Sequence, residues 1–492
     1  MSRNPKHVST LTTVLVTLLI VLMIAATGLI IWLCIAMVQP GQPQVNAPTQ
    51  NIELLTPSTA ATTEPTQAPT TEPPPVPEHV VSTATVAAMG DLVMHMPVVN
   101  TCVSGGGYDF TPVFKYLKDT VSLYDYAVIN LETSLGGPDI PYSGFPLFNS
   151  PDAIVDGARD AGFHMLMTAN NHSGDTRAEG VVRTLEVVRE KGMAAVGSQL
   201  EGEKKYAMVN VNGIQLGMLC YTYATGETSD GRPRLNGNAA LTQAGLINYF
   251  VESNLPAFYT DVEAQIQAMR EEGAEAIILF IHWGVEYQMQ ENATQQAMAQ
   301  KLCDLGVDAI IGRHPHVVEP VALIESTVDP SHKAVCIYSL GNAVSNQRTG
   351  ISSLFPPGYT EDGVLFTVTF EKYSDGKVYL SGADVVPTWV NMHQNNGPKE
   401  YNILPLVDSQ REQWQSLFNL TDANLAAAEK SYDRTLSIVG EGLEVCKAYL
   451  EQAKADREQY YYDLAWNPEK LQPQETTPAT VETTGETLSA AA

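Results

Sequence analysis

The 492-residue sequence has few basic residues, and this shortage limits what the protein can bind. Lysine and arginine together number 28, against 55 aspartates and glutamates, so the formal net charge at pH 7 is -27. A protein that wraps nucleic acid needs a basic surplus to displace counterions from the phosphates. We therefore expect no nucleic-acid partner.

Paired cysteines are also lacking. Six cysteines occur, and no two of them stand in a C-x-x-C spacing. Cys220 and Cys336 fall in apolar runs, so we expect buried free thiols. A disulfide between two cysteines outside the cell is the alternative, and the sequence does not pair them.

Charge is absent from Leu11 to Val38, an apolar stretch long enough to cross a bilayer as a helix. Arg3 and Lys6 precede it, and no Lys or Arg follows for a long stretch. The positive-inside rule then places residues 1–10 in the cytoplasm and the remainder outside. A cleaved signal peptide is the alternative, but its apolar region would be shorter and would end in a small-x-small site. We predict a single-pass membrane anchor over residues 11–38, with an extracellular main domain.

Residues 39–80 and 469–492 are rich in Pro, Thr, Gln and Glu, as in "TTEPTQAPTTEPPPVPEH". Such segments bury too little apolar surface to fold, and their prolines favour extended conformers. We expect a disordered stalk over 39–80 and a disordered tail over 469–492.

Between these ends, apolar runs alternate with amphipathic stretches. The runs "TATVAAMGD", "YDYAVINLE", "FHMLMTANN", "EAIILFIHWG", "VDAIIGRHPH" and "AVCIYSLGN" are typical of buried strands. Helical periodicity in "AEGVVRTLEVVREKG" and "DVEAQIQAMREEG" separates them, and this alternation predicts an α/β domain with a largely parallel sheet over 81–405. Asn212-Gly213 and Asp375-Gly376 indicate hairpins. The pattern over 406–468 is helical and predicts an appendage packed on the core.

Each predicted strand ends in polar residues that suit metal ligation. Asp91 ends the first strand, Glu132 follows the second, and Asn171 with His172 follows the third. His282 ends the fourth, while His314 and His316 follow the fifth on either side of Pro315. A residue before proline favours extended backbone, so these two imidazoles should point to the same side. Ligands bind at the carboxyl ends of strands in α/β sheets, so the set can share one crevice.

Each of these residues also has an ordinary structural interpretation. A single histidine at a strand end is more often a hydrogen-bonded core residue than a ligand, and "ANN" alone can be a turn. The repetition of ligand types at five successive strand ends favours a metal site. Carboxylate, carboxamide and imidazole together suit manganese, zinc or iron, in one site or in two.

In their order along the chain, the motifs "MGDLVMH", "INLETSL", "TANNHSGD", "FIHWGVEY", "GRHPHVVEP" and "YSLGNAVSNQ" resemble the CapA family of poly-γ-glutamate capsule proteins, over roughly residues 83–400. That family is similar to the calcineurin-like metallophosphoesterases. The resemblance implies an α/β/β/α sandwich with a dimetal site. Asp91 and His316 would bind the first ion and Glu132 would bridge. Asn171, His282 and His314 would bind the second ion, and His172 would assist the leaving group.

The leading hypothesis is a membrane-anchored, extracytoplasmic protein that serves synthesis, export or surface attachment of an anionic polymer such as poly-γ-glutamate. Membrane capsule-assembly proteins would be its partners, and metal-dependent hydrolysis its activity if it is an enzyme. Two alternatives stay open. One is a non-catalytic scaffold that binds polymer, and the other is a phosphoesterase or nucleotidase on the outer side of the membrane.

Overall fold

The computed structural model describes residues 76–239, 241, 244–394 and 399–471. The predicted cytoplasmic segment 1–10, the anchor 11–38 and most of the stalk 39–80 lie outside these residues, as does nearly all of the tail 469–492. Within the described ranges, no helix combines the length and hydropathy that crossing a membrane requires. The five cysteines in these ranges are buried free thiols.

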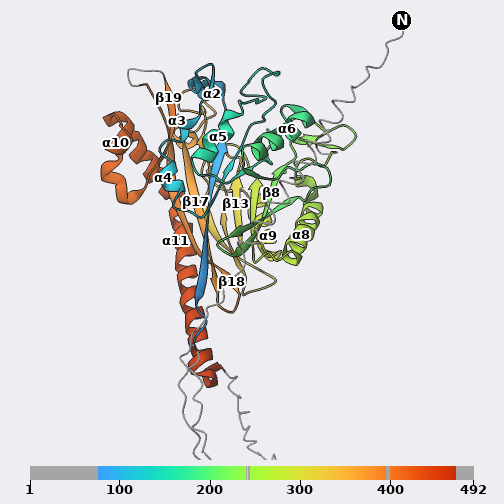
Figure 1. The fold of residues 1–492 in the computed structure, drawn as a ribbon, viewed down its shortest axis with the longest axis vertical. Helices are drawn as coiled ribbons and strands as arrows, with labels where there is room; N and C mark the ends of the chain where they lie inside the picture. Colours follow the sequence, from blue (N-terminus) through green and yellow to red (C-terminus); the bar gives the residue numbers. More distant parts are fainter. Residues whose placement is uncertain (1–75, 240, 242–243, 395–398, 472–492) are drawn as a thin grey trace, which may run out of the picture. The chain divides into compact units, whose positions relative to one another are not determined.

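Two mixed β-sheets form the centre of the domain (Figure 1). The first has the order β19-β18-β17-β1-β4-β5-β6, with β16 paired to β1. Its strands are β1 (Val80–Leu92), β4 (Tyr126–Asn130), β5 (Met165–Met167), β6 (Ala194–Val196), β16 (Asn342–Val344), β17 (Asp362–Tyr373), β18 (Val378–His393) and β19 (Glu400–Pro405). The pairs from β1 to β6 are parallel and those from β1 to β19 are antiparallel, so β1 is where the strand direction changes.

The second sheet has the order β11-β8-β12-β13-β15-β14, with β7 paired to β8. Its strands are β7 (Tyr206–Val211), β8 (Ile214–Tyr223), β11 (Tyr249–Phe250), β12 (Ala276–His282), β13 (Ala309–Arg313), β14 (Val321–Glu325) and β15 (Lys333–Ile337). Strands β7 and β14 are antiparallel to their neighbours, and the others are parallel. The predicted parallel strands are confirmed, but they are divided between two sheets that also carry antiparallel hairpins. At the β7–β8 turn, Asn212 and Gly213 both have positive φ, as the predicted hairpin requires.

Alternate residues of the central strands face different cores, and this produces four layers. In β1, Ala84, Val86 and Ala88 lie in the core between the sheets, whereas Ala87 and Met89 face helices on the outer side. Strand β12 divides its residues in the same way between the inner core and the helices of the second sheet. The α/β/β/α sandwich implied by the resemblance is therefore the architecture observed.

Helices cover the outer face of each sheet. The first group comprises α2 (Met96–Thr101), α3 (Thr111–Phe114), α4 (Lys118–Val121) and α5 (Ala153–Asp160), and α6 (Arg177–Glu190) contacts β6. The second comprises α8 (Leu255–Glu271) and α9 (Ala293–Asp304). These helices cover the outer faces of the two sheets, whose central strands carry apolar residues on both faces.

The predicted C-terminal helical segment contains the short helix α10 (Trp414–Leu417) and the long helix α11 (Asp422–Trp466), which packs against β18 of one sheet and β14 of the other (Figure 1). Val439, Leu443 and Cys446 of α11 belong to the core between the sheets. The Arg434 guanidinium and the Ser431 hydroxyl both donate to the buried carboxylate of Asp362. The helix is thus part of the core and more than an appendage.

Candidate metal centre

The strand ends named above converge where the carboxyl edges of the two sheets meet. Asp91 comes from β1, Glu132 from the loop after β4, and Asn171 from the loop after β5. The second sheet supplies His282 at the end of β12, and the loop after β13 supplies His314 and His316. All six side chains are buried, with Asp91, Glu132 and His282 fully inaccessible to solvent. The parallel strands bring these residues together from a sequence span of more than two hundred positions.

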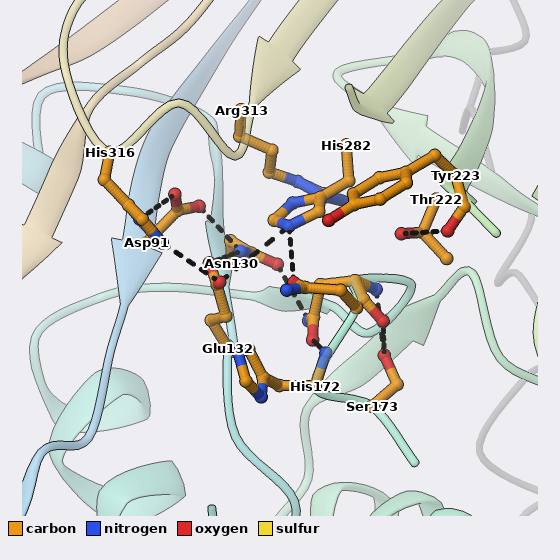
Figure 2. A network of polar contacts seen from close by, with 12 residues as sticks. Asp91, Asn130, Glu132, His172, Ser173, Thr222, Tyr223, His282, Arg313 and His316 are labelled. Atoms are coloured by element: carbon orange, nitrogen blue, oxygen red, sulfur yellow. Dashed lines mark hydrogen bonds and ion pairs between the residues drawn. The ribbon is translucent and has the colours of Figure 1, made fainter. Parts of the chain in front are cut away.

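Two groups of potential ligands share one carboxylate. Asp91, Glu132 and His316 form the first group, and Glu132, His282 and His314 form the second; in each group the ligand atoms lie within 4.8 Å of one another. Figure 2 shows the Asp91 and Glu132 carboxylates with the His282 and His316 rings turned towards one volume. Glu132 Oε1 lies 3.8 Å from His282 Nε2 and 3.6 Å from His316 Nε2, so one oxygen faces both groups.

The predicted ligand Asn171 lies beside the second group. Its Oδ1 is 2.9 Å from His282 Nε2. An amide oxygen and an imidazole nitrogen that approach the same point are suited to sharing a cation, because both can offer lone pairs. All six predicted metal ligands are therefore brought together, five of them in the two groups and Asn171 at their edge.

Several buried atoms at the centre have no hydrogen-bond partner among the described residues. They are Asp91 Oδ2, Glu132 Oε1 and His314 Nδ1. A buried polar atom without a partner costs free energy, so a fold retains such atoms where something else satisfies them. Two carboxylate oxygens and an imidazole nitrogen are ligands for a divalent cation, and the residues present therefore fit a metal site.

The titration behaviour of the cluster reflects burial and close packing of charge. Burial together with the neighbouring Asp91 carboxylate raises the pKa of Glu132 well above its usual range. Burial alone would lower the pKa of His316, but the Glu132 and Asp91 carboxylates outweigh it and raise that pKa to about 9. Burial lowers the pKa of His314 to about 3, and the neighbouring His316 adds to the effect. The two carboxylates therefore favour a positive charge on the Asp91 side of the cluster, whereas the His314 ring is neutral at pH 7.

Neighbouring polar side chains hold the ligands in place. Asn130 Nδ2 donates to Asp91 Oδ1 at 2.7 Å and to Glu132 Oε2 at 3.3 Å, which leaves the other oxygen of each carboxylate facing the centre. Asn342 Oδ1 lies 3.1 Å from His316 Nδ1. Hydrogen bonds of this kind orient the side chains that bind a metal and are a regular part of metal sites. Asn130 and Asn342 both stand in the strand-end motifs, but the sequence does not show whether an asparagine there binds a metal or orients another residue that does.

Arg313 is the unexpected member of the site. Its side chain is fully buried, and it donates to the Ala169 carbonyl and lies 3.3 Å from His282 Nδ1. The guanidinium contacts the opposite ring nitrogen from the one that lies near Asn171 and Glu132. Arg313 therefore places a positive charge beside the second ligand group and competes there with a cation.

The backbone around the two histidines departs from the sequence-based expectation. The prediction of extended backbone at His314 is wrong, because φ is +106° there and +57° at His316. The two rings nevertheless lie 6.0 Å apart, centroid to centroid. Positive φ at a residue with a side chain is strained, and such strain gathers at functional sites where the surroundings enforce it. The histidines converge because of this unusual turn and not because of strand alternation.

His172, the predicted catalytic residue, lies at the rim of the cluster and forms a pair with Asp175. Its Nδ1 is 2.7 Å from Asp175 Oδ2, and the ionised carboxylate can only accept, so Nδ1 carries the proton. Asp175 also accepts from the Phe148 amide and from Asn236 Nδ2. Asp175 was missed by the sequence analysis, although its position three residues after His172 in "TANNHSGD" is a usable signal.

A cleft of about 380 Å³ opens beside the cluster, and His172 and His316 form part of its wall. His95 also lines this cleft, where its ring packs edge-on against Phe148 and its Nδ1 accepts from the Asn346 amide. Burial lowers the pKa of His95 to about 4, which keeps the ring neutral. His95 is not a member of either ligand group. A larger cavity of about 460 Å³, lined by Lys205, Asn248 and Asp261, contains none of the cluster residues.

Comparison with known proteins agrees with the motifs. Residues 85–347, more than half of the chain, match the family model described as bacterial capsule synthesis protein PGA_cap. The chain belongs to this family. The predicted resemblance to CapA is thereby confirmed, and the matched residues contain every member of the cluster.

Two curated relatives carry capsule-related names. The capsule biosynthesis protein CapA of Bacillus anthracis is 27% identical over 334 residues, which is 66% of this chain and 71% of the relative. The PGA biosynthesis protein CapA of Bacillus subtilis (strain 168) is 28% identical over 234 residues, which is 46% of this chain and 52% of the relative.

Solved structures give weaker similarity. An NAD nucleotidase of Haemophilus influenzae aligns with a TM-score of 0.36 at 12% identity, covering 72% of this chain and 68% of that one. A sulfate thiohydrolase of Thermus thermophilus aligns with a TM-score of 0.34 at 14% identity, covering 72% and 60%.

Proposed function

We propose that the cluster binds two divalent metal ions. Asp91 and His316 would hold the first, Asn171, His282 and His314 would hold the second, and Glu132 would be shared by both. The observation that carries this proposal is the Glu132 Oε1 atom, which is buried, lacks a hydrogen-bond partner and faces both histidine groups. Manganese, zinc and iron all accept this mixture of carboxylate, carboxamide and imidazole.

The activity proposed for this site is hydrolysis. When bound, paired divalent ions supply Lewis acidity and lower the pKa of water towards neutrality. Asp175 fixes the His172 ring with its proton on Nδ1, so Nε2 is the nitrogen free to exchange a proton in the cleft. Protonated at Nε2, His172 donates to a leaving group; neutral, it accepts from a nucleophile. Burial of the cluster keeps bulk water away from these groups.

The biological role proposed is in a poly-γ-glutamate-like capsule. The family and the names of the two relatives support a part in the synthesis of such a polymer. Export or surface attachment of the polymer, with other membrane capsule-assembly proteins as partners, belongs to the same proposal. The uncharged stretch from Leu11 to Val38, with Arg3 and Lys6 before it and no Lys or Arg after it until Lys115, supports a membrane anchor that holds the domain outside the cell.

Hydrolysis is tested with the purified full chain, poly-γ-glutamate and simple phosphoesters, in the presence of manganese or zinc. Shortening of the polymer or release of phosphate by the wild type, and its loss in His172→Ala at unchanged metal content, is the expected result. His393→Ala, which changes an imidazole away from the cluster, is the matched control. Equal activity in His172→Ala contradicts the role of this residue, and polymer binding without cleavage by the wild type identifies a scaffold instead.

A further inference from the structure

The cleft beside the cluster is mainly apolar. Its apolar walls are Val93, Phe145, Phe148, Ile351, Leu354 and Phe355. A volume of about 380 Å³ is within the range of small-molecule sites. Its inner end is formed by His172 and His316, so a bound molecule reaches both the apolar walls and the cluster.

The apolar surface continues out of the cleft onto its rim. Phe145 is 75% exposed, Leu354 is 73% exposed and Ile351 is 56% exposed. Large apolar side chains exposed together beside a polar site mark a binding surface more often than an accident of folding. Phe145 comes from the loop after β4, and the other two come from the loop after β16.

Specific contacts fix the backbone of both loops, so these exposed side chains have defined positions. Ser143 and Asn149 exchange backbone hydrogen bonds at 3.0 Å on either side of Phe145. On the other loop, the Thr349 amide donates to Glu361, whose carboxylate also forms a buried ion pair with Arg348. The rim is therefore an ordered part of the domain.

The described residues that line the cleft give an anionic chain no ion pair along the apolar walls. No lysine or arginine is among the residues that line it, and its one carboxylate, Glu286, repels anions. An anionic group can be held only at the inner end, by the cluster and the ions proposed there. The part of the substrate that lies along the rest of the cleft must therefore be uncharged and apolar.

We infer that the cleft binds the hydrocarbon chain of an amphiphilic substrate whose anionic head group lies at the Asp91–Glu132–His316 end. This inference rests on the proposed metal-dependent function, and it assigns the substrate class. A flexible chain is favoured over a flat ring, because a chain can follow the apolar surface from the inner end out to the exposed Phe145 and Leu354. If a polymer were attached to such a chain, the bond between the polymer and the hydrocarbon chain would lie at the cluster.

The test is binding of alkylphosphonates, which are not hydrolysed, to the full chain in lipid nanodiscs with manganese present. Protein-free nanodiscs measure partition of each ligand into lipid. We expect the Kd to fall about threefold per added methylene between ethyl- and octylphosphonate, close to the free energy of burying a methylene. The double variant Phe145→Ala/Leu354→Ala should lose most of this dependence and keep its affinity for ethylphosphonate. Leu123→Ala, equally exposed but remote from the cleft, should behave as wild type.

The outcomes separate this inference from the proposed metal function. A Kd independent of chain length in a protein that binds manganese overturns the inference and leaves the metal site standing. Phenylphosphonate binding as tightly as octylphosphonate also overturns it, in favour of a planar ligand. A dependence on chain length that persists in a protein without bound metal supports the apolar site while contradicting the proposed function.

Discussion

Two glycines in α11 give a sharp test of how this helix belongs to the domain. A Cβ added at Gly442 would lie 1.7 Å from the Val321 carbonyl oxygen and 2.6 Å from the carbonyl carbon, both of them backbone atoms of β14. At Gly440, two positions earlier, an added Cβ meets nothing within 4 Å. The helix thus needs a glycine at 442 for close approach to the sheet, and not at 440.

Alanine at the two positions should therefore have opposite effects. Gly440→Ala should stabilise α11 by about 0.5–1 kcal/mol, because alanine restricts the unfolded chain and favours helix. Gly442→Ala should destabilise it by about 1–3 kcal/mol, because the overlap with Val321 forces the helix away from β14. Since Val439, Leu443 and Cys446 share the core between the sheets, that shift exposes buried apolar surface.

Amide hydrogen exchange of α11 measures the free energy of opening directly and needs no two-state unfolding of the whole chain. The two variants should differ by at least about 1.5 kcal/mol in the protection of the middle of α11. Equal protection in Gly440→Ala and Gly442→Ala would refute the close packing of α11 on β14, and with it the view that the helix is part of the core.

Further predictions concern the polar groups in and around the site. Asp175→Asn should lower the free energy of unfolding by about 1.5–3 kcal/mol, because the buried carboxylate accepts three hydrogen bonds; unchanged urea denaturation would contradict this. Burial raises the pKa of Glu319 to about 8 in the folded protein, whereas the unfolded chain releases this proton near pH 4.5. The folded state therefore loses stability as pH rises from about 4.5 to 8. Across this pH range, the free energy of unfolding of Glu319→Gln should increase relative to that of wild type. A constant difference between the two proteins over this range would show that the carboxyl titrates normally. Arg313→Gln should tighten manganese binding about tenfold by removing a charge beside His282, while Arg313→Lys should not; calorimetric titration of the three proteins decides.

The fold was largely predictable because its central strands are buried on both faces. Strands such as β12 appear in the sequence as continuous apolar runs, and their ends are marked by the first polar residues that follow. The division into two sheets was not visible in these runs. It depends on β1 pairing with β17, nearly three hundred residues later, and on which face each alternate side chain buries.

The convergence of the proposed ligand residues was predictable because these residues directly follow the strands that carry them. Their supports were harder to foresee. Asn236 donates to Asp175 from a loop some sixty residues further along the chain. The side chain of Arg313 is fully buried, which is not expected of a charged residue. The positive φ at His314 arises from the packing around the turn, and the proline that follows it pointed to the opposite conformation.

The most direct test of the central claim is the metal content of the purified full chain by elemental analysis, for wild type and for Asp91→Ala/His316→Ala. His393→Ala serves as the control that changes an imidazole outside the cluster. The account predicts about two equivalents of divalent metal per chain in wild type and control, and clearly less in the double variant. Near-zero metal in folded wild-type protein, even after incubation with manganese and zinc, would contradict it.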